Sequence, residues 1–103
     1  MNFLQLRDGT TVAVDLQCLL SGAPVALGSP TSVVLTRLKA LDHSALSNIT
    51  LTVQDAPTGV VRWTPTAGQV AIVDLGYLCT VVVTGGSNPG TYPSSEYLYI
   101  GVT

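Results

Sequence analysis

The residues with the most obvious catalytic potential lie in one short segment, Asp42-His43-Ser44. An acid, an imidazole and a hydroxyl are the three groups of a hydrolase triad, in which the imidazole takes a proton from the hydroxyl and the acid orients the imidazole. Such a relay needs side chains that converge in a line, whereas consecutive residues direct their side chains away from one another. The segment therefore predicts a polar loop, and we expect no enzymatic activity.

Groups that could hold a metal ion or a phosphate are far apart in the sequence. Zinc sites take three or four protein ligands, and the chain has one histidine and two cysteines, Cys18 and Cys79. The six acidic residues lie mostly at expected turns, where aspartate caps backbone groups. They are Asp8, Asp15, Asp42, Asp55, Asp74 and Glu96. No glycine-rich phosphate motif follows a predicted strand and opens a helix, so we predict no metal and no cofactor.

The charge balance argues against nucleic-acid binding. The net charge is −2, and the four basic residues, Arg7, Arg37, Lys39 and Arg62, form no cluster. Proteins that bind DNA or RNA present grouped Lys and Arg side chains, which release the counterions of the phosphates. We therefore expect no direct contact with nucleic acid.

Neither a membrane span nor a secretory signal is apparent. The two longest windows without charge, residues 16–36 and 75–95, are interrupted by prolines and glycines. The first six residues lack the basic stretch and the long apolar run of a signal peptide. Synthesis in the cytosol is the default expectation, and there Cys18 and Cys79 are expected to be free, buried thiols.

The composition predicts one domain with an unusually apolar surface. The chain has 103 residues, of which 47% are hydrophobic and 10% are charged, against roughly 25% charged in a typical soluble domain. A domain of this size buries at most about two-thirds of its unfolded surface. Much of the apolar exterior is therefore expected to be covered by a partner.

Apolar and polar residues alternate with a period of two along much of the chain. Alternate side chains of a strand lie on one face, so each such run predicts a strand with one buried face. The predicted strands are residues 3–6, 11–18, 49–54, 60–64, 77–83 and 98–102. Phe3–Leu6 is a candidate edge strand, and Trp63 shares an inward face with Val61, which predicts a core tryptophan.

Turn residues separate these runs. Asp8-Gly9 predicts a tight hairpin that joins residues 3–6 to residues 11–18. Residues 55–59 connect two strands, with Gly59 in a left-handed conformation, and residues 85–90 form the longest loop. About seven short strands without a long helix predict an antiparallel β-sandwich or barrel.

Residues 32–46 fit two structures. Val34, Leu38, Leu41 and Ala45 recur at three- and four-residue steps, which suits a helix. The β-branched residues at the start of the segment and its polar second half favour a strand over residues 32–38 followed by a loop. We prefer the strand.

The segment Asp74-Leu75-Gly76-Tyr77-Leu78-Cys79 resembles the corner before strand F of an immunoglobulin domain. In that corner a tyrosine two residues before a cysteine bonds back to the backbone. Trp63, however, lies much too far after Cys18 to be the usual tryptophan of strand C. These residues therefore argue against an antibody-type domain with its disulfide between strands B and F.

A longer resemblance covers the second half of the chain. It begins with Thr58-Gly59-Val60-Val61-Arg62-Trp63-Thr64-Pro65-Thr66, continues through Gly76-Tyr77 into a long strand, and ends with Tyr92-Pro93-Ser94 and a last strand. These elements resemble the immunoglobulin-like domains of tailed bacteriophages, which occur in baseplate upper proteins and in small virion proteins. The resemblance implies a single immunoglobulin-like antiparallel β-sandwich of about seven strands.

The same resemblance implies a structural role in the virion without catalysis. Because the chain stops directly after the last strand, it is similar to a free-standing capsid decoration, or cement, protein that binds in many copies to the major capsid protein. A tail or baseplate component, or a head–tail joining part, is the alternative. Either role implies a homo-oligomer or symmetric copies in an assembly.

Apolar residues at predicted edges and in loops are the candidate contacts with such an assembly. An unpaired edge at Phe3–Leu6 can extend a neighbour's sheet, and the apolar residues of the loop 19–32 lack a strand to bury them. The candidate interface residues are Phe3, Leu4, Leu6, Leu19, Leu20, Pro24, Val25, Leu27, Tyr92, Tyr97 and Tyr99. Two alternatives stay open. One is a carbohydrate- or receptor-binding sandwich with Trp63 and the tyrosines as a stacking platform, and the other is an inhibitor or adaptor in the bacterial cytosol.

Overall fold

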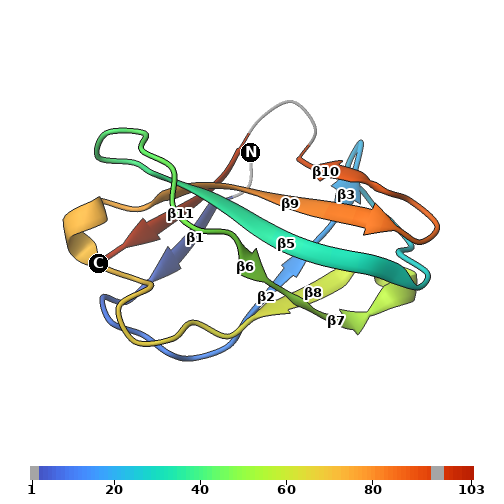
Figure 1. Cartoon of the computed structure of the whole chain (residues 1–103), viewed down its shortest axis with the longest axis horizontal. Coiled ribbons are helices and arrows are strands. Elements are labelled where there is room, and N and C mark those ends of the chain that lie inside the picture. The colour runs from blue at the N-terminus through green and yellow to red at the C-terminus, as the bar shows by residue number, and fades with distance from the viewer. Residues whose placement is uncertain (1–2, 94–96) are drawn as a thin grey trace.

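The computed structural model describes residues 3–93 and 97–103 (Figure 1). These residues form eleven strands and two short 3-10 helices, which confirms the predicted all-β class. The strands are β1 (Phe3–Leu6), β2 (Val14–Gln17), β3 (Leu19–Leu20), β4 (Ala23–Pro24), β5 (Pro30–Lys39), β6 (Ile49–Thr50), β7 (Thr52–Asp55), β8 (Val60–Trp63), β9 (Tyr77–Gly85), β10 (Gly90–Tyr92) and β11 (Leu98–Val102), and the helices are η1 (Ala56–Thr58) and η2 (Ile72–Asp74).

The strands form two main sheets and one small hairpin. In the larger sheet the order is β1-β11-β9-β5-β6, and β10 pairs with β9 as well. The smaller sheet has the order β2-β8-β7, while β3 and β4 pair only with each other. Figure 1 shows β5 and β9 crossing the molecule in one layer, with β2, β8 and β7 in the other. The central strand β9 pairs with β5 along one edge. Along its other edge, residues 77–79 pair with β11 and residues 81–83 pair with β10.

Alternating residues of the facing strands build one shared core. Along β9 the buried residues are Tyr77, Cys79, Val81 and Val83, with less buried residues between them. Val61 and Trp63 of β8 are fully buried and contribute to the same core from the smaller sheet. The prediction of a core tryptophan is confirmed. Burying a large apolar side chain contributes roughly 2–3 kcal/mol, so these strands hold the two sheets together.

Residues 32–46 form a strand and then a loop, as preferred from their composition. The strand β5 extends from Pro30 to Lys39 and pairs with β9 along nearly its whole length. Its β-branched residues suit the pleated surface, and the three- and four-residue spacing of apolar residues does not produce a helix. A loop follows, in which Ala45 makes a single bridge to Leu38.

The predicted hairpin at Asp8-Gly9 is wrong. β1 pairs with β11 in parallel, whereas β2 pairs with β8 in the other sheet, so residues 7–13 cross between the sheets. The Asp8 N–H donates to Thr103 C=O and the Gly9 N–H to Val70 C=O, both at 2.8 Å. These long-range bonds replace the short-range pairing that the dipeptide favours. The strand predicted over residues 11–18 is correspondingly shorter, from Val14 to Gln17.

The run of residues 49–54 is divided between the two sheets. β6 pairs with β5, and β7 pairs with β8. Leu51 lies between them, buried, with its N–H donating to Val33 C=O. Residues 55–59 then connect two strands as predicted, through η1 and Gly59 at φ 73°. A side chain at Gly59 would meet the carbonyl of Val25, so glycine is required there for space as well as for φ.

Candidate functional site

Asp42, His43 and Ser44 form a closed turn. The Ser44 N–H and hydroxyl both donate to Asp42 Oδ1, at 3.0 and 2.6 Å. The bonds from Ser44 lower the pKa of the Asp42 carboxyl. The His43 N–H donates to Lys39 C=O at 2.8 Å, and His43 has φ 61°. Because the serine hydroxyl bonds to the aspartate, this segment has the geometry of a polar turn and lacks the order of a proton relay.

A buried polar cluster that the sequence analysis missed lies around Arg37. This residue is 7% exposed, and its guanidinium carbon lies 5.8 Å from the ring centre of Trp63 and 5.3 Å from that of Tyr77. Its Nη1 donates to Gln69 C=O at 3.0 Å, while Gln69 Oε1 accepts from Trp63 Nε1 at 3.3 Å. Burial lowers the pKa of the Arg37 guanidinium. Arg37 lies on the inward face of β5 together with Val33 and Leu35. The sequence did not mark that face, because apolar residues occur on both faces of residues 33–38.

The Tyr77 hydroxyl ties the start of β9 to the preceding segment. It accepts a hydrogen bond from Ala71 N–H at 2.9 Å and donates one to Asp74 Oδ2 at 2.8 Å. Asp74 also lies 3.7 Å from Lys39 Nζ. Burial raises the pKa of Tyr77. The hydroxyl is therefore a structural link between β9 and residues 71–74.

Cys18 and Cys79 are buried and unpaired, which confirms the prediction of free thiols. Burial raises the pKa of Cys18 to about 11 and that of Cys79 to about 12. The thiolate is the form that acts as nucleophile or metal ligand, so neither sulfur is poised for these roles. No group of three His, Cys, Asp or Glu side chains that could hold a metal ion occurs within residues 3–93 and 97–103. In that same part of the chain, no helix has the length and apolarity to cross a membrane.

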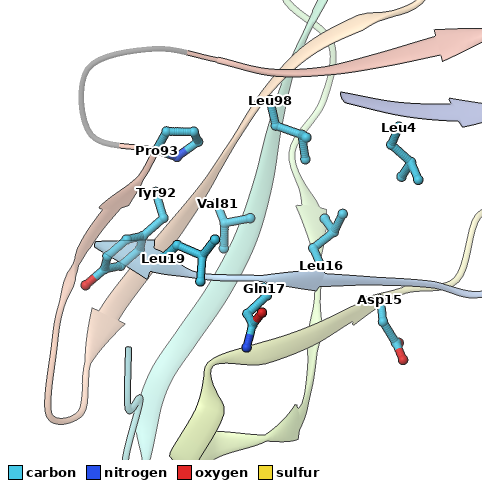
Figure 2. Close-up of a pocket in the computed structure, with 9 residues that line it drawn as sticks. All are labelled: Leu4, Asp15, Leu16, Gln17, Leu19, Val81, Tyr92, Pro93 and Leu98. Carbon is cyan, nitrogen blue, oxygen red and sulfur yellow. The ribbon is translucent and has the colours of Figure 1, made fainter. Parts of the chain in front are cut away.

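The structure does bring three of the predicted interface residues together around one cleft. Leu4 of β1, Leu19 of β3 and Tyr92 of β10 line a cavity of about 220 Å³ at the open side between the two sheets (Figure 2). We call this cavity the edge cleft. Its lining residues, among those that the structure describes, are Leu4, Asp15, Leu16, Gln17, Leu19, Val81, Tyr92, Pro93 and Leu98.

Polar side chains at the edge cleft are bonded to partners outside it. Asp15 pairs with Arg62 on the neighbouring strand, with distances of 2.7 and 3.2 Å from the carboxylate to Nε and Nη2. Gln17 Nε2 donates to Thr58 C=O at 2.9 Å. The tyrosine hydroxyl of Tyr92 donates to Asn88 C=O at 2.9 Å, and burial raises its pKa. The cleft is therefore lined mainly by leucine, valine, proline and aromatic carbon.

Three of the predicted interface residues are buried: Tyr92, which lines the edge cleft, and Val25 and Leu27 of the loop 19–32. Val25 is 6% exposed and Leu27 is fully buried, so the expectation that their loop leaves them uncovered is wrong. The Val25 N–H donates to Cys18 C=O and the Leu27 N–H to Ala56 C=O. These backbone bonds hold the loop against the sandwich without a long strand, and the two side chains complete the core.

The remaining predicted residues are scattered. Leu20, 57% exposed, and Pro24, also exposed, lie on the β3–β4 hairpin, and Tyr97 is 45% exposed. Leu6 packs against the core. The Tyr99 hydroxyl donates to Leu75 C=O at 3.1 Å. Phe3 lies in β1, and its side chain is outside the part of the chain that the structure describes.

A second apolar surface escaped the sequence analysis. Leu41, Ile72, Val73 and Leu75 are between 48% and 71% exposed, and we call them the end cluster. The Leu41 N–H donates to Asp74 C=O at 3.1 Å, which brings the loop after β5 against η2 at one end of the molecule (Figure 1). The sequence does contain an apolar run at residues 70–75. Its pattern of residues, however, predicts neither a strand nor an exposed turn.

No protein-family model, curated protein or solved structure matches this chain.

Proposed function

We propose that this chain is a structural accessory protein of a bacteriophage virion with an immunoglobulin-like β-sandwich fold, and that it decorates the head shell in many copies. A tail, baseplate or head–tail joining position is the alternative. In either position the chain acts by docking onto a larger assembly, and it carries no catalytic step.

The observation that carries this proposal is the apolar exterior of a sparsely charged domain. Seven large apolar side chains among the described residues are at least 45% exposed, while 10% of the chain is charged. Four of these seven form the end cluster, and the edge cleft adds a recessed apolar surface. Removing apolar surface from water yields roughly 25 cal/mol per Å². With few charges to desolvate, docking of such a surface is favourable.

The strand order supports the immunoglobulin-like part of the proposal. An immunoglobulin sandwich places strands B, E and D in one sheet and G, F, C and C′ in the other. The order β2-β8-β7 corresponds to B-E-D, and the order β11-β9-β5-β6 corresponds to G-F-C-C′. In both sheets the strands follow one another along the chain as the letters do. The hydroxyl of Tyr77, two residues before Cys79, bonds to the backbone upstream of its strand, as a tyrosine corner does.

A carbohydrate-binding role receives less support. A stacking platform needs an aromatic face in contact with solvent, and Trp63 is fully buried between the sheets. Tyr97 remains the exposed aromatic residue among the described positions. We therefore favour the docking role.

Co-sedimentation tests the proposal directly. The purified chain is incubated with empty heads, and separately with tails, of the phage that encodes it, and the bound fraction is measured after pelleting. Saturable binding in many copies to heads supports decoration, and binding to tails supports the alternative. Failure to pellet with either particle contradicts both. Gel filtration of the free chain measures the expected self-association.

A further inference from the structure

We propose that the free edge of β2 and the edge cleft form one docking site for an extended segment of a partner polypeptide. The segment adds to β2 as an extra strand and places one large, uncharged apolar side chain in the cleft. This inference rests on the proposed docking role and names the surface and the kind of partner that the role uses.

The first argument is the unpaired edge of β2. Among the described strands β2 pairs with β8 alone, through residues 14–17 opposite residues 60–63. In an antiparallel pair, residues alternate between those bonded to the partner strand and those whose N–H and C=O point to the other side. Half of the backbone groups of β2 are therefore directed away from β8. These N–H and C=O groups can form hydrogen bonds with the backbone of another extended segment.

The second argument is the cavity directly beside that edge. Asp15, Leu16 and Gln17 are consecutive residues of β2 and all line the edge cleft, so a strand added there would lie across its mouth. Figure 2 shows the leucines of β1, β2, β3 and β11 gathered around the opening. Its volume of about 220 Å³ exceeds the roughly 150 Å³ of an apolar cavity that accommodates benzene. A leucine, phenylalanine or methionine side chain therefore fits it.

The charges of the site restrict the partner further. The carboxylate of Asp15 is engaged by Arg62 on the adjacent strand, on the face of the sheet opposite to Leu16. Among the described lining residues, no charged group is left to neutralise a charge in the cleft, and burying an unpaired charge is costly. The side chain that enters is therefore aliphatic or aromatic.

A second copy of this chain is a poorer occupant of the same edge. If β2 of another copy paired here, its inward residue would be Leu16, which is 8% exposed and already packed in its own core. That copy has no spare large side chain on the inward face of β2 to fill the cavity. In a partner segment that is extended before it binds, an inward-facing side chain is not yet packed in a core and is available to fill the cavity.

The test uses a seven-residue probe peptide, Thr-Thr-Thr-Leu-Thr-Thr-Thr, with the intact chain. A second probe has the same sequence with N-methyl groups on alternate backbone nitrogens, which removes strand donors and keeps the leucine. We expect amides within residues 14–17 to gain at least about tenfold protection from hydrogen exchange with the first probe. We expect the methylated probe to bind at least about tenfold more weakly.

Neighbouring residues of β3 provide matched variants. Leu19 lines the cleft and Leu20 is exposed outside it. Leu19→Glu should weaken probe binding at least about tenfold, and Leu20→Glu should leave it within about twofold. Circular dichroism checks that each variant is folded. The methylated probe tests strand addition independently, because it needs no substitution in the chain.

Several outcomes overturn the inference. These are no binding of the first probe at millimolar concentration, equal binding of both probes, protection confined to β1 or the end cluster, and self-association through β2. Co-sedimentation separates these failures from failure of the proposed function. If the Leu19→Glu chain binds particles as well as the unaltered chain does, the docking role stands and the cleft is not its site. If the unaltered chain binds no particle, the docking role fails whatever the probes show.

Discussion

At the scale of single residues, burial in the folded chain alters the hydroxyl of Tyr77 and the thiols of Cys18 and Cys79. The hydroxyl makes two hydrogen bonds in a partly buried site. The thiols are held in their neutral form because burial disfavours the charged form. Both effects contribute to stability, and each gives a separate prediction.

Replacing Tyr77 by phenylalanine should lower the free energy of unfolding by about 1–3 kcal/mol. The substitution keeps the ring and leaves the Ala71 N–H without its acceptor in a partly buried site. Urea denaturation followed by tryptophan fluorescence measures the change. Tyr97→Phe is the matched control, because that residue is 45% exposed and its substitution should alter stability by less than about 0.5 kcal/mol. Equal effects of the two substitutions would contradict the role of the Tyr77 bonds.

The thiols predict a loss of stability at alkaline pH. Their pKa values rise from an ordinary value of 9.0 to about 11 for Cys18 and about 12 for Cys79 in the folded chain. The unfolded chain thus loses these protons at lower pH than the folded chain does. The contribution to stability is complete below pH 9, and it decreases as the pH rises from there through the folded pKa values.

Two measurements check this prediction. The free energy of unfolding, measured in urea, should fall from pH 9 to pH 11, and a chain with both cysteines replaced by alanine should show a shallower decrease. At pH 8 a disulfide reagent should modify the native thiols at least about a hundredfold more slowly than the thiols of the urea-unfolded chain. Rapid modification of the native chain would show that the sulfurs are accessible.

At the scale of elements, the short helix η2 ends in a conformation that its sequence does not favour. Leu75 follows the helix with φ 62° and is 55% exposed. A left-handed conformation costs a residue with a side chain roughly 1–2 kcal/mol. The element persists because its backbone bonds to Leu41 and to Asp8 tie it to two other segments. The result is an exposed apolar turn at one end of the molecule.

Leu75→Gly should therefore raise the free energy of unfolding, by up to about 1 kcal/mol after the greater entropy of unfolded glycine is subtracted. Leu41 is 55% exposed as well and does not have a positive φ, so Leu41→Gly is a suitable control and should destabilise the chain. Thermal or urea unfolding compares the two variants. A destabilised Leu75→Gly chain would show that the leucine side chain, and not backbone strain, decides stability at this turn.

At the scale of the whole molecule, apolar surface and scarcity of charge determine how the domain associates. The net charge is −2. The described residues form two ion pairs, Lys39–Asp74 and Arg62–Asp15. The exposed Arg62–Asp15 pair is worth little. Contacts with an assembly are thus expected to depend on removal of apolar surface from water.

Sodium sulfate at about 0.5 M should accordingly strengthen binding to phage particles, because excluded salts favour burial of apolar surface. Co-sedimentation with and without the salt measures the effect. Sodium chloride at the same ionic strength is the control, and it should not release the bound chain, since screening acts on charge contacts. Release by sodium chloride would show that the interface is electrostatic.

Much of the fold was predictable because strand patterns are local. The period of two correctly placed Trp63 and Tyr77 in the core, and β-branched composition correctly indicated a strand at β5. The candidate site was predictable only in part. Leu4, Leu19 and Tyr92 were named, but they come from three strands whose meeting point no local pattern specifies. Val25 and Leu27 were misplaced because backbone bonds to Cys18 and Ala56 bury them.

The sequence by itself determined the inward faces of β8 and β9, the all-β class, and an exterior that is apolar and poor in charge. These properties depend on residue type and on spacing along a short stretch of chain. Only the tertiary structure decided that β1 joins β11 in parallel, that β2 pairs with β8 alone among the described strands and lies beside a cleft, and that η2 and the loop after β5 share an apolar end. Each of these features arises from contacts between residues distant in sequence. Their energies depend on which surfaces meet, and so the folded chain alone establishes them.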